Sequence, residues 1–114
     1  KVPQTPEQRI AIVNATLAQT VKATILGVIE VQKAGFISVD TTRAALGYLE
    51  SVEKFSLAIA KMQDVGATWQ TLVASIPTLA LSLRSPPGLV ASSVDENMTL
   101  IDSSVKKILS EVAK

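Results

Sequence analysis

Cysteine and histidine are both missing from the 114 residues of this chain. Without cysteine, the chain has no disulfide, no thiolate metal ligand and no thiol nucleophile. Without histidine, it lacks the commonest general base and the commonest transition-metal ligand of proteins. Catalysis would therefore depend on carboxylates, hydroxyl groups and lysines alone. We expect the protein not to be an enzyme and to hold no cofactor and no metal.

Charge is also scarce, because charged residues make up 18% of the chain and the net charge is +1. A nucleic-acid binder normally concentrates Lys and Arg on one face. The longest basic cluster here is the pair Lys106–Lys107, so we expect no nucleic-acid partner. The hydrophobic fraction of 47% is too high for a disordered chain. A chain of this length can bury one core, which predicts a single domain over residues 1–114.

The chain opens with Lys1 rather than Met, and its first six residues contain no apolar signal core. A mature exported protein, either periplasmic or derived from a lipoprotein, begins in this way after its leader is removed. A domain excised from a longer chain begins in the same way. The opening residues fit both origins and do not select between them.

Apolar residues recur at helical spacing in four segments, at about residues 6–34, 41–65, 67–84 and 94–113. No stretch shows the sustained alternation of period two that is typical of a strand. Two long helical segments joined by a short connection predict a helical hairpin. The sequence therefore predicts an all-α, antiparallel four-helix bundle, with two long helices followed by two shorter ones.

Capping residues mark the ends of these segments. Thr5-Pro6-Glu7-Gln8 and Ser93-Val94-Asp95-Glu96 have the pattern of capping boxes, which predicts helix starts after Thr5 and Ser93. We expect Asp40 to be the N-cap of the second helix. Gly35 and Gly66 are suited to the left-handed position after a helix, so they predict the ends of the first two helices.

Proline interrupts the second half of the chain. Pro77 lies inside the third segment and lacks a backbone donor, which predicts a kink or a break near this residue. The run Arg84-Ser85-Pro86-Pro87-Gly88 predicts a linker before the last helix.

Each segment has an apolar stripe that we expect to face the core. The expected core positions are Ile10, Val13, Leu17, Val21, Ile25 and Val28; Ala45, Tyr48, Val52, Phe55, Ile59 and Met62; Trp69, Leu72, Val73, Ile76, Leu79, Ala80 and Leu83; and Val94, Met98, Ile101, Val105, Ile108 and Val112.

Two glycines and two glutamates inside the helical segments have alternative explanations. Gly27 and Gly47 each cost about 1 kcal/mol relative to alanine, and close helix packing explains both. Around Gly27 that packing could be internal or between chains. Glu50 and Glu53 share a helix face at a spacing that resembles half of a carboxylate metal site. Both lie opposite the core stripe, so we interpret them as a solvated charged face.

Large apolar residues also fall on faces that are otherwise polar. Ile12 and Leu26 lie on such a face of the first helix, and Leu46 and Leu57 on that of the second. One exposed leucine needs no explanation. Four large apolar residues on neighbouring helices indicate a second packing surface.

The third segment has no charged residue between Asp64 and Arg84, and its polar face consists of hydroxyl groups, among them Thr71, Ser75 and Thr78. Such a face suits burial, because Ser and Thr can donate to the carbonyl four residues earlier. The segment could lie centrally in the bundle, in a subunit interface, or against lipid or an apolar ligand. Its many hydroxyls and its proline do not match a membrane-spanning helix.

These features predict a non-enzymatic helical interaction module that self-associates as a homo-oligomer or docks a protein partner. The expected partner-binding residues are Ile12, Leu26, Leu46, Leu57, Thr71, Ser75 and Thr78. The alternative is a bundle that binds a membrane surface, a lipid or an apolar ligand. It ranks second, because amphipathic surface binders usually present Lys and Arg beside their apolar face and the third segment presents none.

Overall fold

The computed structural model describes residues 4–80, 83 and 92–113, with side chains for all of these except 92–95. This part of the chain forms four α-helices, α1 (Pro6–Lys33), α2 (Val39–Asp64), α3 (Trp69–Ala80) and α4 (Ser92–Ala113), and contains no strand. The prediction of an all-α fold is confirmed. The predicted linker at residues 84–88 lies outside the described residues.

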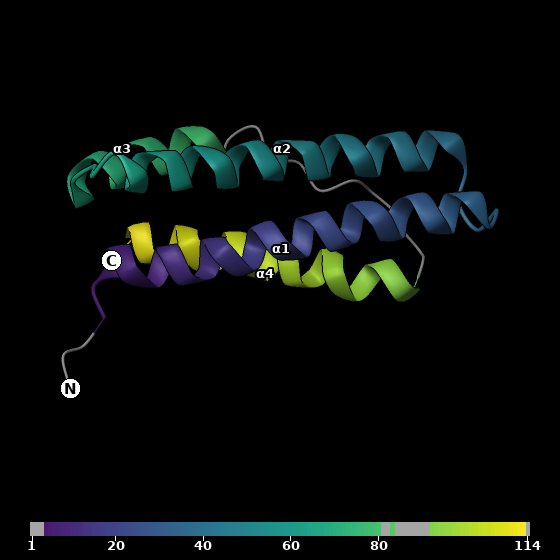
Figure 1. The fold of residues 1–114 in the computed structure, drawn as a ribbon, viewed down its shortest axis with the longest axis horizontal. Coiled ribbons are helices and arrows are strands. Elements are labelled where there is room, and N and C mark those ends of the chain that lie inside the picture. Colours follow the sequence, from purple (N-terminus) through teal and green to yellow (C-terminus); the bar gives the residue numbers. More distant parts are fainter. Residues whose placement is uncertain (1–3, 81–82, 84–91, 114) are drawn as a thin grey trace.

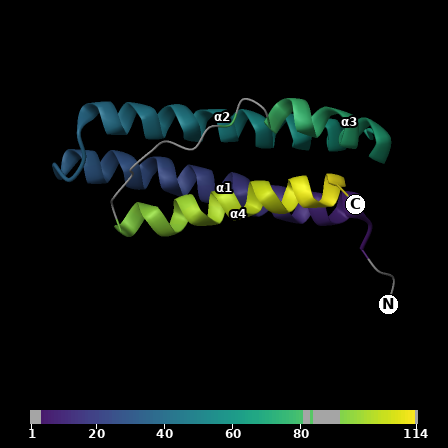
Figure 2. The same cartoon turned by 180° about the vertical axis from the view of Figure 1, so that it is seen from behind.

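The helices pack as a bundle in two layers. Helix α1 makes its most extensive contacts with α4 and then with α2, whereas α3 contacts α2 and α4 less extensively. Figures 1 and 2 show α2 and α3 in one layer and α1 and α4 in the other. The first helix in the chain is therefore the one most extensively enclosed by its neighbours.

Helix α1 begins with the predicted capping box. The Thr5 hydroxyl accepts a hydrogen bond from the Gln8 N–H at 3.1 Å, and the Gln8 side chain accepts one from the Thr5 N–H at 3.0 Å. Pro6 occupies the first turn, where its missing N–H leaves no helical hydrogen bond unmade. These local contacts explain why the start of α1 was predicted correctly.

The first two helices end at glycines in the left-handed conformation, as predicted. Gly35 has a φ of 83° and Gly66 a φ of 71°. After α1, the Phe36 N–H donates to Val31 O at 3.1 Å. After α2, the Ala67 N–H donates in the same way to Met62 O at 3.0 Å. This pattern is the Schellman motif, which satisfies carbonyl groups that the last helical turn leaves open.

The starts of the other helices differ from the predictions. Ser38, not Asp40, is the N-cap of α2, because its hydroxyl accepts the Thr41 N–H at 3.1 Å. Asp40 lies inside the first turn, where its negative charge still favours the positive end of the helix dipole. The N-cap prediction for Ser93 is also wrong, because α4 already begins at Ser92. Adjacent capping residues offer alternative starts at both places.

Helix α3 is shorter than the predicted segment at 67–84. It starts at Trp69, and the Thr68 hydroxyl accepts the Thr71 N–H at 3.3 Å. The helix continues through Pro77 and ends at Ala80. Leu83, the next described residue, is not helical.

One apolar cluster forms the core, and all four helices contribute to it. Its buried members are Ile10, Leu17, Val21, Val28, Ala45, Tyr48, Leu49, Val52, Phe55, Ile59, Leu72, Ile76, Ile101, Val105 and Ile108. All of them except Leu49 belong to the predicted stripes. Val13, Ile25, Met62, Met98 and Val112 pack against this cluster but are only partly buried.

Three polar residues are buried with this core, and none of them was predicted there. Asn14 lies between α1 and α2, where its amide nitrogen donates to Ser56 O at 3.0 Å. The Asn14 amide oxygen is buried without a partner among the described atoms. Thr24 is satisfied within its own helix, since its hydroxyl donates to Thr20 O at 2.6 Å.

Candidate functional site

The apolar side chains that were expected on the outer faces differ in how much surface they expose. Ile12 exposes 53%, Leu26 65% and Leu57 62% of their surface, although each belongs to a helix whose opposite face lies in the core. Leu46 is only half-buried and packs against the core cluster. Of these four apolar residues, Ile12, Leu26 and Leu57 are therefore the ones that are freely accessible.

The hydroxyl residues of α3 do not lie at the centre of the bundle. Thr71 and Thr78 are exposed, and Ser75 is half-buried. The Ser75 hydroxyl lies 2.9 Å from Thr71 O and 3.1 Å from the Met62 sulfur, so both acceptors are within reach. The bond to the carbonyl four residues earlier is the one expected for a hydroxyl in a helix.

Sequence reasoning missed exposed apolar residues at the helix ends. Phe36, directly after the glycine that ends α1, exposes 79% of its surface, and Val39 at the start of α2 is also exposed. Val65 precedes the glycine that ends α2 and is exposed as well. Their places beside the predicted helix ends could have revealed them, because a side chain at a tight turn has few neighbours that can cover it.

A shallow hollow lies on the outer face of α2. Its volume is about 400 Å³, and it is lined by Val39, Thr42, Arg43, Leu46, Gly47 and Glu50. Arg43 and Glu50 are the two charged residues of this lining, and both are exposed. A Cβ added at Gly47 would meet no other heavy atom within 4 Å. Close packing against the described part of the chain therefore does not explain Gly47, contrary to the prediction.

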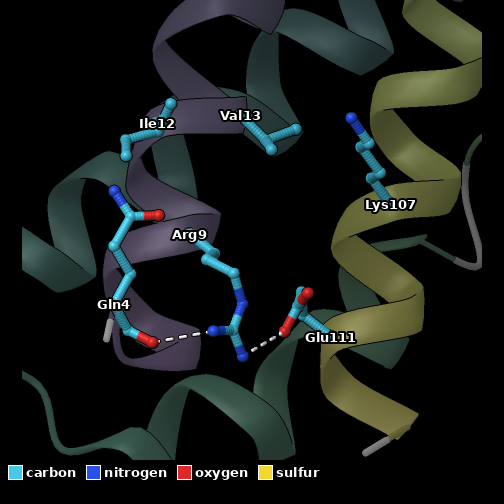
Figure 3. Close-up of a pocket in the computed structure, with 6 residues that line it drawn as sticks. All are labelled: Gln4, Arg9, Ile12, Val13, Lys107 and Glu111. Carbon is cyan, nitrogen blue, oxygen red and sulfur yellow. Dashed lines mark hydrogen bonds and ion pairs between the residues drawn. The ribbon is translucent and has the colours of Figure 1, made fainter. Parts of the chain in front are cut away.

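A second pocket opens where the start of α1 meets the end of α4 (Figure 3). Its volume is about 180 Å³, and it is lined by Gln4, Arg9, Ile12, Val13, Lys107 and Glu111. The side chains of Arg9 and Glu111 point toward one another across the pocket. Arg9 Nη2 lies 3.0 Å from Glu111 Oε2, and Arg9 Nη1 donates to Gln4 O at 2.7 Å. This ion pair ties α1 to α4, and the Glu111 side chain is only 13% exposed.

The charged groups elsewhere are arranged for solvent contact. Among the described residues, no three or more His, Cys, Asp or Glu side chains gather where they could hold a metal ion. Glu50 is exposed and Glu53 is half-buried. On α4, Lys106 Nζ lies 2.9 Å from Asp102 Oδ2. The hydrogen bond that Lys106 donates to this carboxylate, followed by the carboxylate's charge, raises the pKa of Lys106 above its ordinary value.

Comparison with known proteins adds no relative to this picture. No protein-family model, no curated protein sequence and no solved structure matches the chain.

Proposed function

We propose that this protein is a non-enzymatic helical interaction module that self-associates or docks a protein partner. One observation carries the proposal: Ile12, Leu26 and Leu57 each expose more than half of their surface on helices whose opposite faces are buried. Apolar side chains that gather on neighbouring elements of a folded domain are typical of protein–protein contacts. The exposed hydroxyl residues Thr71 and Thr78 of α3 belong to the same proposal and carry no charge.

An antiparallel arrangement of the helices, with α3 kinked near Pro77, belongs to the same proposal. The bond from Gln63 to Glu7 O and the bond from Asn14 to Ser56 O both join the first part of α1 to the last part of α2. The kink is supported by the missing N–H of Pro77 and by the steric conflict between its ring and the preceding turn.

Light scattering behind size exclusion, over a wide range of protein concentration, tests the proposal. We expect a mass above the 12.0 kDa of one chain that falls on dilution. Leu57→Glu should lower the mass to that of one chain and keep the helical circular dichroism, since this side chain lies outside the core. Ser110→Glu on α4 is the matched control, because Ser110 is exposed and belongs to none of the proposed contact residues.

The proposed surface is wrong if Leu57→Glu associates as the unmodified protein does. Self-association itself is wrong if the unmodified protein has the mass of one chain at every concentration. The docking form of the proposal then predicts a protein partner whose binding Leu57→Glu weakens and Ser110→Glu does not.

Binding to a lipid surface is the second candidate, and one property of α1 favours it. Within the described part of the chain, α1, with 28 residues, is long and apolar enough to cross a membrane. The core helix of a bundle meets the same criteria, and Leu17 and Val21 of α1 are fully buried. Lipid contact through these residues would require the bundle to open.

Co-sedimentation with vesicles of anionic and of neutral lipids tests this alternative. Lipid binding predicts that the protein pellets with the vesicles and that the fluorescence of Trp69, the only tryptophan, shifts to shorter wavelength. Protein that stays in solution with unchanged fluorescence contradicts the membrane-surface form.

A further inference from the structure

We propose that the hollow on α2 binds the same hollow of a second copy of this chain, with the two α2 helices antiparallel around a two-fold axis between Leu46 and Gly47. This inference rests on the self-associating form of the proposed function. It adds the partner, the contact residues and the symmetry of the contact.

Gly47 is the first observation behind this inference. Glycine inside a helix lowers helix stability relative to alanine, because glycine loses more backbone freedom on folding. The space around Gly47 would accept a Cβ without any contact inside the described chain. Gly47 is one of the residues that line the hollow. A glycine here lets another backbone or a large side chain approach α2 closely, which packing within the described part of the chain does not require.

The residue beside Gly47 supplies a matching shape. In a two-fold contact, each residue faces the residue that is equally far from the axis on the other chain. Leu46 of one chain then faces Gly47 of the second copy, and the reverse contact forms at the same time. Leu46 lines the hollow while its inner side packs against the core, so its position is fixed before association. A large side chain held rigidly opposite a glycine is a favourable packing arrangement.

The two charged residues that line the hollow are self-complementary under the same symmetry. Arg43 and Glu50 are equally far from the axis, so Arg43 of each chain faces Glu50 of the other. Neither of these side chains forms an ion pair within the described part of the chain. A parallel pairing of the two α2 helices would instead place Arg43 beside Arg43. The charge pattern therefore favours the antiparallel two-fold contact over the parallel one.

One exposed apolar residue extends the contact along α2. Leu57 lies about 16 Å from the axis along the helix at 1.5 Å per residue. Leu57 follows Leu46 and Glu50 along one stripe of α2, because the spacings of four and seven residues return to the same face. Leu57 exposes 62% of its surface in the single chain, so it is free to contact the second copy.

Reciprocal charge reversal tests this geometry. Arg43→Glu places two glutamates opposite each other at each of the two symmetry-related charge contacts, and Glu50→Arg places two arginines there. Each single variant should therefore dimerise at least about tenfold more weakly than the unmodified protein at low salt. An equimolar mixture of the two variants should regain association, because every reversed residue then faces the opposite charge. The double variant Arg43→Glu/Glu50→Arg should associate with itself for the same reason.

Sedimentation velocity on each variant and on the mixture separates the outcomes, with circular dichroism as the folding control. Recovery in the mixture supports the antiparallel contact. The geometry is wrong if the single variants dimerise normally, or if they are monomeric and the mixture stays monomeric. If Leu57→Glu still abolishes association in those cases, the proposed function survives without this contact. An unmodified protein that is monomeric throughout overturns both the contact and the self-associating function.

Gly47→Gln gives an independent steric test. Glutamine favours the helix over glycine, and there is open space for its Cβ in the single chain. We expect this variant to fold at least as well as the unmodified protein but to dimerise more weakly, because its side chain occupies the place of Leu46 of the second copy. Unchanged or tighter dimerisation would overturn the packing at the axis.

Discussion

Alanine substitution at three glycines should separate the effect of backbone conformation from that of space. Gly35, Gly47 and Gly66 all have room for a Cβ, because it would meet no heavy atom of the described residues within 4 Å at any of them. They differ in backbone conformation. Gly47 lies inside α2, whereas Gly35 and Gly66 have φ angles of 83° and 71°. The sign of the change in stability should therefore follow φ alone.

The expected magnitudes follow from this difference. Gly47→Ala should stabilise the protein by about 1 kcal/mol, because alanine has the higher helix propensity. Gly35→Ala and Gly66→Ala force an L-residue into the left-handed region, at a cost of about 1–2 kcal/mol. Reduced freedom of the unfolded chain offsets part of that cost, by about 0.4–1 kcal/mol. We expect net destabilisation of about 1 kcal/mol at each of these two positions.

Urea unfolding followed by far-UV circular dichroism measures the three changes. The midpoint should rise for Gly47→Ala and fall for the other two, with an unchanged slope of free energy against urea. In thermal unfolding, 1 kcal/mol corresponds to about 4 °C for a domain of this size. The measurements should be made at several protein concentrations, because association also contributes to apparent stability.

Two results would refute the reasoning. Destabilisation by Gly47→Ala at the lowest protein concentration would mean that α2 is not an ordinary helix at this position. A neutral Gly35→Ala or Gly66→Ala would mean that the turn relaxes into another conformation without cost.

Three further predictions concern polar contacts. Arg9→Met should destabilise the protein by about 1–2 kcal/mol in urea unfolding, because it removes the ion pair that joins α1 to the Glu111 carboxylate, which is only 13% exposed; an unchanged midpoint would contradict this prediction. Asn14→Leu should raise stability by about 1 kcal/mol in urea unfolding, since apolar burial replaces one hydrogen bond and an unpartnered oxygen, and a clear loss would count against this account. Because Asp102 raises the pKa of Lys106, Lys106→Gln should lower the temperature of the unfolding midpoint at pH values below 10.5, the ordinary lysine pKa. This difference in midpoint should vanish as the pH rises through the raised pKa of Lys106. Lys107→Gln is the control, and a difference that persists at high pH excludes the ion pair as its cause.

The apolar stripes of α1, α2 and α4 were readable from the sequence because helical spacing alone determines which residues share a face. Leu49 was missed because α2 packs against helices on two sides, which widens its buried face beyond a narrow stripe. Asn14 and Ser56 were missed for a different reason. A polar residue is buried only where a partner on another helix satisfies it, and the sequence does not show which residues of two helices meet.

The residues of the candidate surface could be predicted only in part, because the sequence does not show which residues of neighbouring helices meet. Leu46 and Leu57 have similar places relative to the core stripe, yet Leu46 is half-buried and Leu57 exposed. The difference depends on how neighbouring side chains cover each level of the bundle, which periodicity does not specify. The open space at Gly47 is likewise a property of the folded chain, because the sequence alone suggests that a helix packs against this glycine.

The extensive packing of α1 against α4 has a consequence for how the chain folds as it is synthesised. Synthesis completes α1 long before α4, since residues 34–91 separate the two helices. Until α4 leaves the ribosome, the side of α1 that it covers stays open to water, so the bundle can close only late. Closing this long loop also slows folding relative to pairing of α1 with the adjacent α2. A nascent chain in which α1 and α2 are packed together but their apolar surface is still uncovered is therefore the species that chaperones would meet.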